Sequence, residues 1–284
     1  MASGAETSQG ALFVVATPIG NLRDITLRAV DVLREADRVL AEDTRRTRAL
    51  LSHLGIAGKP VDRLDAHAEA DAVAGILARI EAGCRVALVT DAGTPVVSDP
   101  GALLIRAAAE RGLAITPVPG ASAVMAAVTL SGLVSSGFRF LGFLPRGGPE
   151  RREAVERIVT TPEAVVLFES PQRLQETLAE LAQAMPDRDA VVARELTKLH
   201  EEAVRGTLAA LAAPPGRAWI GEITLVLGPY AGRAAPALGE AEIDARIDEE
   251  LARGRRAKDV AEALALETGR PKRELYGRVI ARRG

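Results

Sequence analysis

The sequence predicts an α/β protein in which two α/β units precede a small helical module. Through the first 120 residues, short apolar runs alternate with segments of helical period, which is typical of a mostly parallel sheet covered by helices. After about residue 130 the connections become shorter, which indicates a second α/β unit with more antiparallel pairing. With 284 residues, of which 48% are hydrophobic, the chain can bury the core of one large domain or of two ordinary ones.

The first unit is predicted from four strand-like runs, each followed by a helical segment. The strands are Leu12–Ala16, Arg38–Ala41, Arg85–Val89 and Ala114–Val118. The helices are Asp24–Ala36, Thr44–Leu54, a segment that opens at Asp99-Pro100 and a segment that opens near Ser122. Asp43 is well placed as the N-cap of the second helix, while Asp99 and Pro100 supply a cap and a first-turn proline for the third.

The second unit and the tail continue this pattern. The strands of the second unit are Phe138–Phe143, Ala164–Phe168, Ala190–Ala193 and Ile220–Leu227, and its helices are Glu150–Val159 and Gln172–Ala184. Gly228-Pro229 ends the unit, and three amphipathic helices follow a linker. These helices are Glu240–Arg253, Ala257–Thr268 and Pro271–Ala281. We therefore expect domains at residues 11–120 and 121–230 and a helical module at 236–284.

Charge is balanced over the whole chain but not along it. The sequence has 36 Lys and Arg against 38 Asp and Glu, whereas residues 251–284 hold ten basic and four acidic residues. A basic tail on an acidic body indicates an anionic partner, with a solvated terminal helix as the equally weighted alternative. One cysteine, no export signal and no long apolar segment predict a cytoplasmic protein that does not enter a membrane.

Several familiar chemistries have no motif in this chain. Neither a G-x-G-x-x-G after a strand nor a G-x-x-x-x-G-K-[ST] occurs, so dinucleotide and P-loop phosphate binding are not predicted. Gly120-Ala-Ser122 lacks the second glycine of a nucleophile elbow, which argues against a serine hydrolase. His53, His67 and His200 are widely separated and accompany a single cysteine, so we predict no metal site.

Polar segments rich in Gly and Pro follow most of the predicted strands. The most informative is Thr90–Gly101, TDAGTPVVSDPG, which places two Gly, two Pro and two Asp directly after a buried strand. In open α/β sheets, ligands bind beyond the carboxyl ends of the strands. Any one segment is adequately explained as a turn or a cap, but together they predict a shared pocket. The others are Thr17–Leu22, Glu42–Arg45, Pro117–Ala123, Gly142–Pro145, Phe168–Pro171 and Ala193–Lys198.

These segments also resemble a known family. In order along the chain they read TPIGNLRDIT, AEDTR, TDAGTPVVSDPG, VPGASA, GFLPR, FESPQR, ARELTK and GEITLVLG. The set resembles the tetrapyrrole methylase superfamily of S-adenosylmethionine-dependent enzymes and, within it, the branch of ribosomal RNA small subunit methyltransferases I. The resemblance runs from residue 12 to residue 228 and extends to the helical tail, so it covers nearly the whole chain.

The resemblance implies a two-domain tetrapyrrole-methylase-like (class III methyltransferase) fold with S-adenosylmethionine in the cleft between the domains, usually in a homodimer. It also implies 2′-O-methylation of a cytidine in the decoding region of 16S rRNA, either in free RNA or within the small ribosomal subunit. The residues that it assigns to the cofactor are Pro18, Asp91, Ala92, Gly93, Thr94, Val97, Ser122, Ala123, Phe168, Glu169, Leu196 and Glu222.

Two segments depart from the pattern of that branch. Where the branch often has H-N-E, this chain has His67-Ala68-Glu69, which removes an amide at position 68. Where the branch has a P-G-P turn, this chain has Pro119-Gly120-Ala121, which keeps a small residue but loses rigidity. Neither departure affects the expected cofactor site.

Methylation of a ribose hydroxyl would benefit from a general base, because the hydroxyl is a poor nucleophile at neutral pH. The candidate catalytic residues are Asp43, Glu195 and Lys198, with Glu69 as a further carboxylate. The resemblance matches Asp43 to an acidic position proposed as a base in tetrapyrrole relatives. Asp43 is equally well explained as an N-cap, and Glu195 with Lys198 as a surface ion pair.

RNA contacts are expected from basic side chains. Aromatic residues make up only 3% of the chain, too few for a platform of stacked bases, and the last two helices have the size of a helix-turn-helix. The candidate RNA-binding residues are Arg23, Arg45, Arg46, Arg146, Arg256, Lys258, Lys272 and Arg273. A small-molecule methyltransferase of tetrapyrrole type would have no use for these cations, and a non-catalytic RNA-binding protein would not need the cofactor loops.

Overall fold

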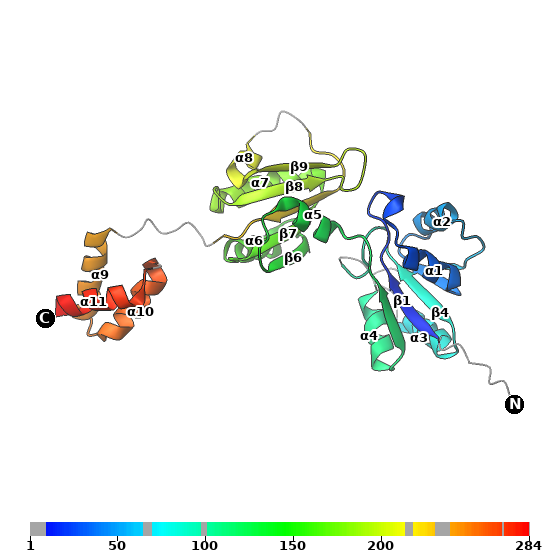
Figure 1. The fold of residues 1–284 in the computed structure, drawn as a ribbon, viewed down its shortest axis with the longest axis horizontal. Helices are drawn as coiled ribbons and strands as arrows, with labels where there is room; N and C mark the ends of the chain where they lie inside the picture. Colours follow the sequence, from blue (N-terminus) through cyan, green and yellow to red (C-terminus); the bar gives the residue numbers. More distant parts are fainter. Residues whose placement is uncertain are drawn as a thin grey trace. The chain divides into compact units, whose positions relative to one another are not determined.

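The chain forms two compact units. One comprises Met1–Ile158 and Glu163–Pro229, and the other comprises Val159–Pro162 and Tyr230–Gly284. The structure, a computed structural model, describes residues 10–64, 70–97, 101–213, 218–230, 239–268 and 270–283 (Figure 1). None of the helices in these ranges is long and apolar enough to cross a membrane.

The first half of the larger unit is a parallel sheet of five strands in the order β3-β2-β4-β1-β5. Its strands are β1 (Ala11–Val15), β2 (Arg38–Ala41), β3 (Val61–Arg63), β4 (Arg85–Val89) and β5 (Ala114–Val118). The connecting helices are η1 (Leu22–Asp24), α1 (Leu27–Glu35), α2 (Thr44–His53), α3 (Ala70–Glu81) and α4 (Ala102–Glu110). Because the strands are parallel, all five carboxyl ends lie at one edge of the sheet.

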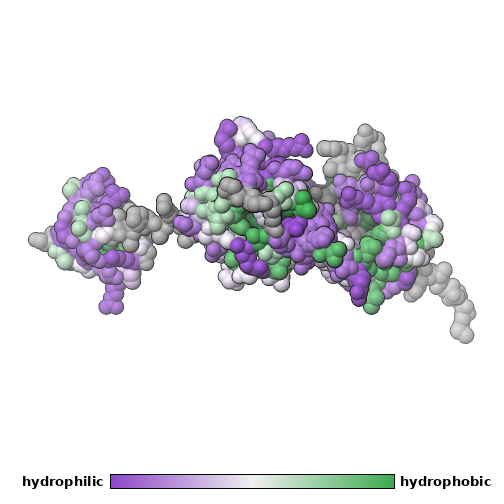
Figure 2. Space-filling model, turned by 90° about the horizontal axis from the view of Figure 1, so that it is seen from above, coloured by the Kyte–Doolittle hydropathy of each residue, from purple (hydrophilic) through white to green (hydrophobic). Residues whose placement is uncertain are grey.

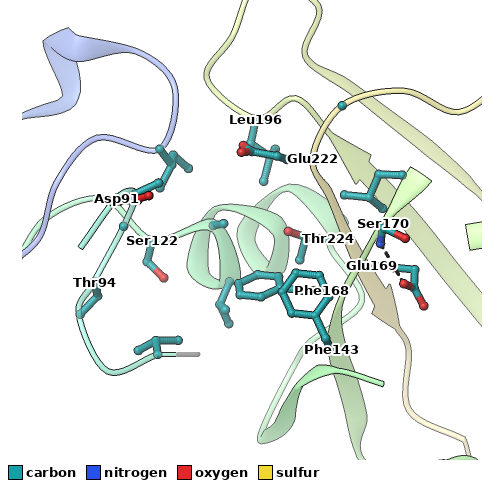
Figure 3. Close-up of a pocket in the computed structure, with 18 of the residues that line it drawn as sticks. Asp91, Thr94, Ser122, Phe143, Phe168, Glu169, Ser170, Leu196, Glu222 and Thr224 are labelled. Atoms are coloured by element: carbon teal, nitrogen blue, oxygen red, sulfur yellow. Dashed lines mark hydrogen bonds between the residues drawn. The ribbon is translucent and has the colours of Figure 1, made fainter. Parts of the chain in front are cut away.

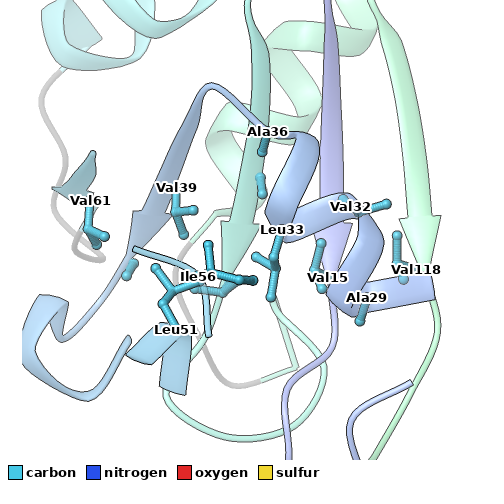
Figure 4. Close-up of a cluster of buried hydrophobic side chains, with 13 residues drawn as sticks. Val15, Ala29, Val32, Leu33, Ala36, Val39, Leu51, Ile56, Val61 and Val118 are labelled. Carbon is cyan, nitrogen blue, oxygen red and sulfur yellow. The ribbon is translucent and has the colours of Figure 1, made fainter. Parts of the chain in front are cut away.

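Alternate residues of these strands face opposite sides of the sheet, and both sides are buried. On one side, β1 and β4 pack against α1 and α2 through Val15, Val89, Leu33 and Leu51 (Figure 4). On the other side, the next residues in each strand pack against α3 and α4. Burial on both faces explains why the strands are near-continuous apolar runs.

The second half of the larger unit is a mixed sheet in the order β6-β7-β10-β8-β9, in which only the pair β6 and β7 is parallel. Its strands are β6 (Phe138–Phe143), β7 (Ala164–Glu169), β8 (Asp189–Arg194), β9 (Glu202–Thr207) and β10 (Ile223–Leu227). Its helices are α5 (Ala123–Ser131), α6 (Gly148–Val159), α7 (Pro171–Ala184) and α8 (Leu208–Ala212). The last strand in the sequence, β10, is the central strand, and all five of its residues are buried.

The smaller unit contains a three-helix module with its own core. Its helices are α9 (Glu240–Ala252), α10 (Ala257–Thr268) and α11 (Lys272–Arg283), and its core includes Ile243, Ile247, Val260, Leu264 and Leu275. Between residues 239 and 284 the chain has eleven basic and ten acidic residues. The basic excess of the tail is therefore almost cancelled once α9 is counted with the two helices that follow it.

Several of these opposite charges form ion pairs between α9 and α11. Arg278 pairs with Glu240 and Asp244, and Arg282 pairs with Asp244 and Asp248. The visible surface of this module, at the left of Figure 2, is mostly hydrophilic. The charges of Arg278 and Arg282 that face α9 are therefore paired within the module.

The predicted elements agree closely with the structure. All eight predicted strands occur, with bounds that differ by at most three residues. Four elements, β3, α3, β9 and α8, were not predicted. The predicted start of the third helix was wrong, because α4 begins at Ala102 with Gly101 as its N-cap at φ 122°. Asp99 and Pro100, the expected cap and first-turn proline, lie outside the described residues.

Candidate functional site

A cavity of about 470 Å³ lies where loops of the two sheets meet within the larger unit (Figure 3). From the first sheet it is lined by segments that follow β1, β2, β4 and β5, at the carboxyl edge expected for a ligand site. From the second sheet it is lined by the ends of β6 and β7, the segment after β8 and the start of β10. Because β10 is antiparallel to its neighbours, its start lies at the same edge as their ends.

The loop after β4 forms one wall of the cavity and is held in a defined conformation. Gly93 pairs with Thr17 through two backbone hydrogen bonds of 2.8 and 3.0 Å, and the Thr94 hydroxyl donates to the Ala121 carbonyl at 3.3 Å. Gly93 has φ 87°, and Val96 has φ 75°, a costly conformation for a β-branched residue. A strained backbone held by neighbouring loops is typical of a binding site.

Asp91 connects this loop to the start of α2. Its Oδ1 accepts a hydrogen bond from the Asp43 N–H at 3.0 Å, and its Oδ2 lies 3.5 Å from the Arg46 guanidinium. Asp43 is the N-cap of α2, because its carboxylate accepts a 2.8 Å hydrogen bond from the Arg45 N–H. That backbone hydrogen bond lowers the pKa of the Asp43 carboxyl. Asp91 therefore fixes the position of the chain immediately after β2.

Aromatic side chains form an apolar wall on the opposite side of the cavity. The Phe168 ring contacts Phe140 in an edge-to-face arrangement with centroids 4.9 Å apart, and Phe143 lies 5.6 Å away at a tilt (Figure 3). Phe143 is 58% exposed and lines the cavity, so its ring is accessible to a ligand. This wall offers a flat, neutral surface to a ring of similar chemistry.

Glu169 is buried behind that wall. Its carboxylate accepts hydrogen bonds from the Ser170 N–H at 2.8 Å and from the Thr177 hydroxyl at 2.7 Å. Arg151, which is also buried, donates to the Thr177 hydroxyl, to the Glu180 carboxylate and to the Pro145 carbonyl. Through these contacts the network holds the loop after β6 against α7. The Glu169 carboxylate thus supports the wall, although the residue also lines the cavity.

Glu195, Lys198 and Glu222 form an ion triad beneath another edge of the cavity. The Lys198 ammonium donates to Glu195 at 2.9 Å and to Glu222 at 2.8 Å, and the Glu222 N–H donates to the Glu195 carboxylate at 2.9 Å. The hydrogen bond from Lys198 lowers the pKa of Glu195. Burial lowers the pKa of Lys198, but its hydrogen bonds to the two carboxylates outweigh burial and raise that pKa overall.

Most residues assigned to the cofactor line the cavity. They are Asp91, Ala92, Gly93, Thr94, Val97, Ser122, Ala123, Phe168, Glu169, Leu196 and Glu222. Pro18 is not among the lining residues, and its neighbour Ile19 takes that place. The lining also includes residues that were not assigned to the cofactor one by one. Ile19, Glu42, Phe143, Ser170 and Pro171 lie within the Gly- and Pro-rich segments predicted to share a pocket, and Gly221 and Ile223 lie in the segment expected to face the adenine and ribose. Val124 and Thr224 were not predicted, and their neighbours in the sequence were the available signal.

None of the three candidate catalytic residues is among the described residues that line the cavity. Asp43 caps α2, while Glu195 and Lys198 belong to the ion triad. Glu69 lies outside the described residues. In this structure Asp43, Glu195 and Lys198 are therefore not placed to contact a substrate in the cavity. A general base at the reacting atoms would have to be another residue, or one of these three after a rearrangement.

The candidate RNA-binding residues fall into two groups. Arg46 lines the cavity and is 66% exposed, whereas Arg45 is 89% exposed on the same turn of α2. Arg23 and Arg146 are exposed as well. In the module, Lys272 pairs with Glu262. The remaining module candidates, all exposed, are Arg256, Lys258 and Arg273.

The described residues contain no group of three or more His, Cys, Asp and Glu side chains that is arranged to hold a metal ion. Three carboxylates of the cavity wall, those of Asp91, Glu169 and Glu222, are instead engaged with backbone amides, a hydroxyl group and basic side chains.

Comparisons with known proteins identify the family of the chain. The family model of the tetrapyrrole (corrin/porphyrin) methylases matches residues 11–212, and the chain belongs to that family. A ribosomal RNA small subunit methyltransferase I from Neisseria meningitidis serogroup A is 45% identical over 94% of this chain and 92% of its own. The protein of that name from Halalkalibacterium halodurans is 39% identical over 94% of both chains. The chain thus lies within the ribosomal RNA small subunit methyltransferase I family.

Solved structures share the fold at lower identity. A diphthine synthase superimposes with a TM-score of 0.59 and 20% identity over 77% of this chain and 90% of its own. A uroporphyrin-III C-methyltransferase from Thermus thermophilus, complexed with S-adenosylhomocysteine, gives a TM-score of 0.52 and 20% identity over 77% and 97% of the two chains. The two-sheet part of this chain therefore has the class III methyltransferase fold.

Proposed function

We propose that this protein uses S-adenosylmethionine to methylate the ribose 2′-hydroxyl of a cytidine in the decoding region of 16S rRNA, within the small ribosomal subunit in the cytoplasm. The observation that carries this proposal is the cavity, because segments resembling those of one methyltransferase family meet around it. The names of the relatives support ribosomal RNA as the substrate.

The residues of the cavity fit S-adenosylmethionine. This molecule contains a carboxylate, an ammonium group, a ribose and an adenine but no phosphate, so it needs no cluster of cations. Among the described lining residues Arg46 is the single cation, and Asp91 already faces it. The Phe168 wall suits the neutral adenine, whereas Asp91 and Glu222 suit the ammonium and the ribose hydroxyls. Gly93 allows close approach of the backbone.

When bound, S-adenosylmethionine supplies a methyl group that is already activated by a positively charged sulfur. The contribution of this chain is then to hold the ribose hydroxyl in line with that methyl group and to exclude water, which can account for much of the rate. The loop after β4, fixed through Gly93 and Thr94, supports such positioning. A residue that removes the hydroxyl proton would add to it.

RNA would be held by basic side chains outside the cavity. We assign this role to Arg23, Arg45, Arg46 and Arg146 near the site and to Arg256, Lys258, Lys272 and Arg273 in the module. Phosphate contacts of this kind make binding weaker as salt is raised. Deletion of residues 236–284 should reduce both RNA affinity and its dependence on salt, as measured by titration of labelled rRNA fragments. An unchanged salt slope would mean that the module is structural.

We also propose that the chain acts as a homodimer. Helix α5 supports this, since it contains no charged residue and leaves Met125 53% exposed. A helix that is apolar on all sides normally has all sides covered. Light scattering of the purified protein should give twice the mass of the chain, and Met125→Glu should shift it toward the mass of a monomer.

A second candidate function is methylation of a small molecule of tetrapyrrole type, which the family description favours. One experiment separates the two. The protein is incubated with labelled S-adenosylmethionine and, in parallel, with small ribosomal subunits, naked 16S rRNA or a tetrapyrrole, and the labelled atom is mapped. Label on a ribose 2′-oxygen supports the first function, label on the tetrapyrrole supports the second, and label on a base contradicts the 2′-O assignment.

A further inference from the structure

We propose that Glu42, the residue immediately before Asp43, is the general base that accepts the proton of the ribose hydroxyl. This inference rests on the function proposed above and names the residue that its chemistry requires. Three observations carry it: Glu42 lines the cavity, its backbone is held in place, and its carboxylate is free to react. The sequence analysis named Asp43, Glu195 and Glu69 as candidate carboxylates and did not name Glu42.

The position of Glu42 is set from both sides. It follows Ala41, the buried last residue of β2, which pairs with Arg63 of β3. It precedes Asp43, whose N–H is bonded to the Asp91 carboxylate on the neighbouring loop after β4. The backbone of Glu42 therefore cannot shift without breaking the sheet or this hydrogen bond. A residue held in this way at a cavity wall is preorganised for a reaction there.

The carboxylate of Glu42 differs from every other carboxylate on the described cavity wall. Asp91 accepts from the Asp43 N–H, Glu169 accepts from Ser170 and Thr177, and Glu222 binds Lys198. In the described part of the chain, Glu42 has no hydrogen bond and no ion pair, and its side chain is exposed. It is thus the lining carboxylate with both oxygens available to a substrate.

Asp43 is poorly suited to the same task. Its carboxylate is bonded to the Arg45 N–H as the helix cap, and this hydrogen bond lowers its pKa, which weakens it as a base. It is also not among the residues that line the cavity. The two adjacent acids therefore have different roles. Asp43 caps helix α2, and Glu42 lines the cavity and is available to the substrate.

Methyl transfer and proton transfer are coupled in the proposed step. The ribose 2′-oxygen forms a bond to the methyl carbon while its proton passes to a carboxylate oxygen of Glu42. The bond between that carbon and sulfur breaks, and its electron pair stays on the sulfur, which becomes neutral. Glu42 is then a neutral carboxylic acid and returns its proton to water. No oxidant, reductant or metal is needed.

The test compares Glu42→Gln with Asp43→Asn in the full-length protein. With small ribosomal subunits as substrate, Glu42→Gln should lower kcat by about 10²- to 10⁴-fold, the usual contribution of a general base. Asp43→Asn keeps a good capping oxygen and should leave kcat within about threefold of wild type. Calorimetric titration should give the same Kd for S-adenosylmethionine in both variants, and both should melt near the wild-type temperature.

A rescue experiment adds a readout that a structural role would not produce. In Glu42→Ala, added formate should restore part of the rate in proportion to its concentration, because a free carboxylate can occupy the space left by the side chain. Formate should not restore Glu195→Ala. If the Kd of Glu42→Ala for S-adenosylmethionine rises by as many fold as its kcat falls, Glu42 is a ligand of the methyl donor and the proposal is overturned.

Different results would contradict the proposed function and the assignment of Glu42 as the base. If the wild-type protein places label on a ribose oxygen but Glu42→Gln retains its rate, the assignment of Glu42 is wrong and the proposed function stands. If the wild-type protein labels a base or a small molecule, the proposed function is wrong, whatever Glu42→Gln does. A large loss in Asp43→Asn with none in Glu42→Gln would return the role to Asp43.

Discussion

Single residues around the cavity are held by charge as well as by shape. Lys198 lies between the carboxylates of Glu195 and Glu222, so that one cation joins the segment after β8 to the start of β10. Glu195 has φ 51° and Thr197 has φ 66°, conformations that non-glycine residues adopt only when their surroundings enforce them. The ion triad supplies that enforcement, and Leu196 of the cavity wall lies between the two strained residues.

This triad predicts a defined dependence of stability on pH. The folded-state pKa of Glu195 is lowered, so its contribution is complete above the ordinary value of about 4.3 and is lost as pH falls through the lower folded value. The folded-state pKa of Lys198 is raised, so its contribution is complete below about 10.4 and is lost as pH rises through the higher folded value.

Thermal melts of wild type and Glu195→Gln across this range check that prediction. The difference in Tm should be constant between about pH 5 and pH 10 and should narrow on both sides. A difference that stayed unchanged down to pH 2 would show that Glu195 acts through packing and not through charge.

Gly221 gives a second prediction at the residue scale. It has φ 84°, and a Cβ added there would lie 2.3 Å from the Glu195 carboxylate oxygen. Gly221→Ala should therefore break the bond from the Glu222 N–H to Glu195 and cost about 1–3 kcal/mol in backbone strain alone. Calorimetry should show weaker binding of S-adenosylmethionine.

Gly75→Ala is the matched control, because a Cβ at this helical position meets nothing within 4 Å. It should leave the Kd unchanged and raise Tm slightly, since alanine favours a helix. Equal effects of the two substitutions on binding would contradict the role of Gly221.

At the scale of elements, α6 and α7 position the aromatic wall through a buried guanidinium. The Arg151 side chain is 7% exposed and joins α6 to Glu180 and Thr177 of α7. Arg151→Ala should lower the free energy of unfolding by about 3 kcal/mol, because it leaves buried acceptors without their donor. Urea denaturation measures this loss. The neighbouring Arg152 is exposed, so Arg152→Ala should change stability by less than about 0.5 kcal/mol.

The elements that could be predicted from sequence are those whose apolar residues indicate that they are buried. Strands such as β4 and β10 are apolar runs, because neighbours cover both faces. Strand β9, with the sequence EAVRGT, is an edge strand of intermediate burial and carries no such signal. Helix α3 was not predicted, although its sequence has an amphipathic pattern that is sufficient to indicate a helix.

Most residues assigned to the cofactor line the cavity, but the hydrogen-bond partners of single side chains were not predictable. Gly- and Pro-rich segments after strands marked the loops that meet at the cavity, including Asp91 and Thr94. Adjacent carboxylates such as Glu42 and Asp43 differ only in which one bonds the helix backbone, and that depends on φ, ψ and neighbouring loops. For the same reason, the sequence did not predict that the Glu169 carboxylate accepts a hydrogen bond from the buried Thr177 hydroxyl.

At the scale of the whole molecule, the chain divides into two units with separate cores. We therefore expect two transitions in a calorimetric melt, since two-state unfolding applies to single domains. Leu275 is fully buried in the module, and Leu275→Ala should destabilise it by about 2–5 kcal/mol. Only the transition of the smaller unit should move. If both transitions moved by the same amount, the two units would unfold together.

The central position of β10 affects how the protein can fold during its translation on the ribosome. All strands of the first sheet lie within residues 11–118, so that sheet can form while the rest of the chain is still being translated. The second sheet cannot close in the same stepwise way, because β10 separates β7 from β8 and is translated last. A nascent chain that ends before residue 223 also lacks Ile223 and Thr224 of the cavity wall. We therefore expect the cavity proposed to bind S-adenosylmethionine to be complete only when translation of the larger unit is nearly finished.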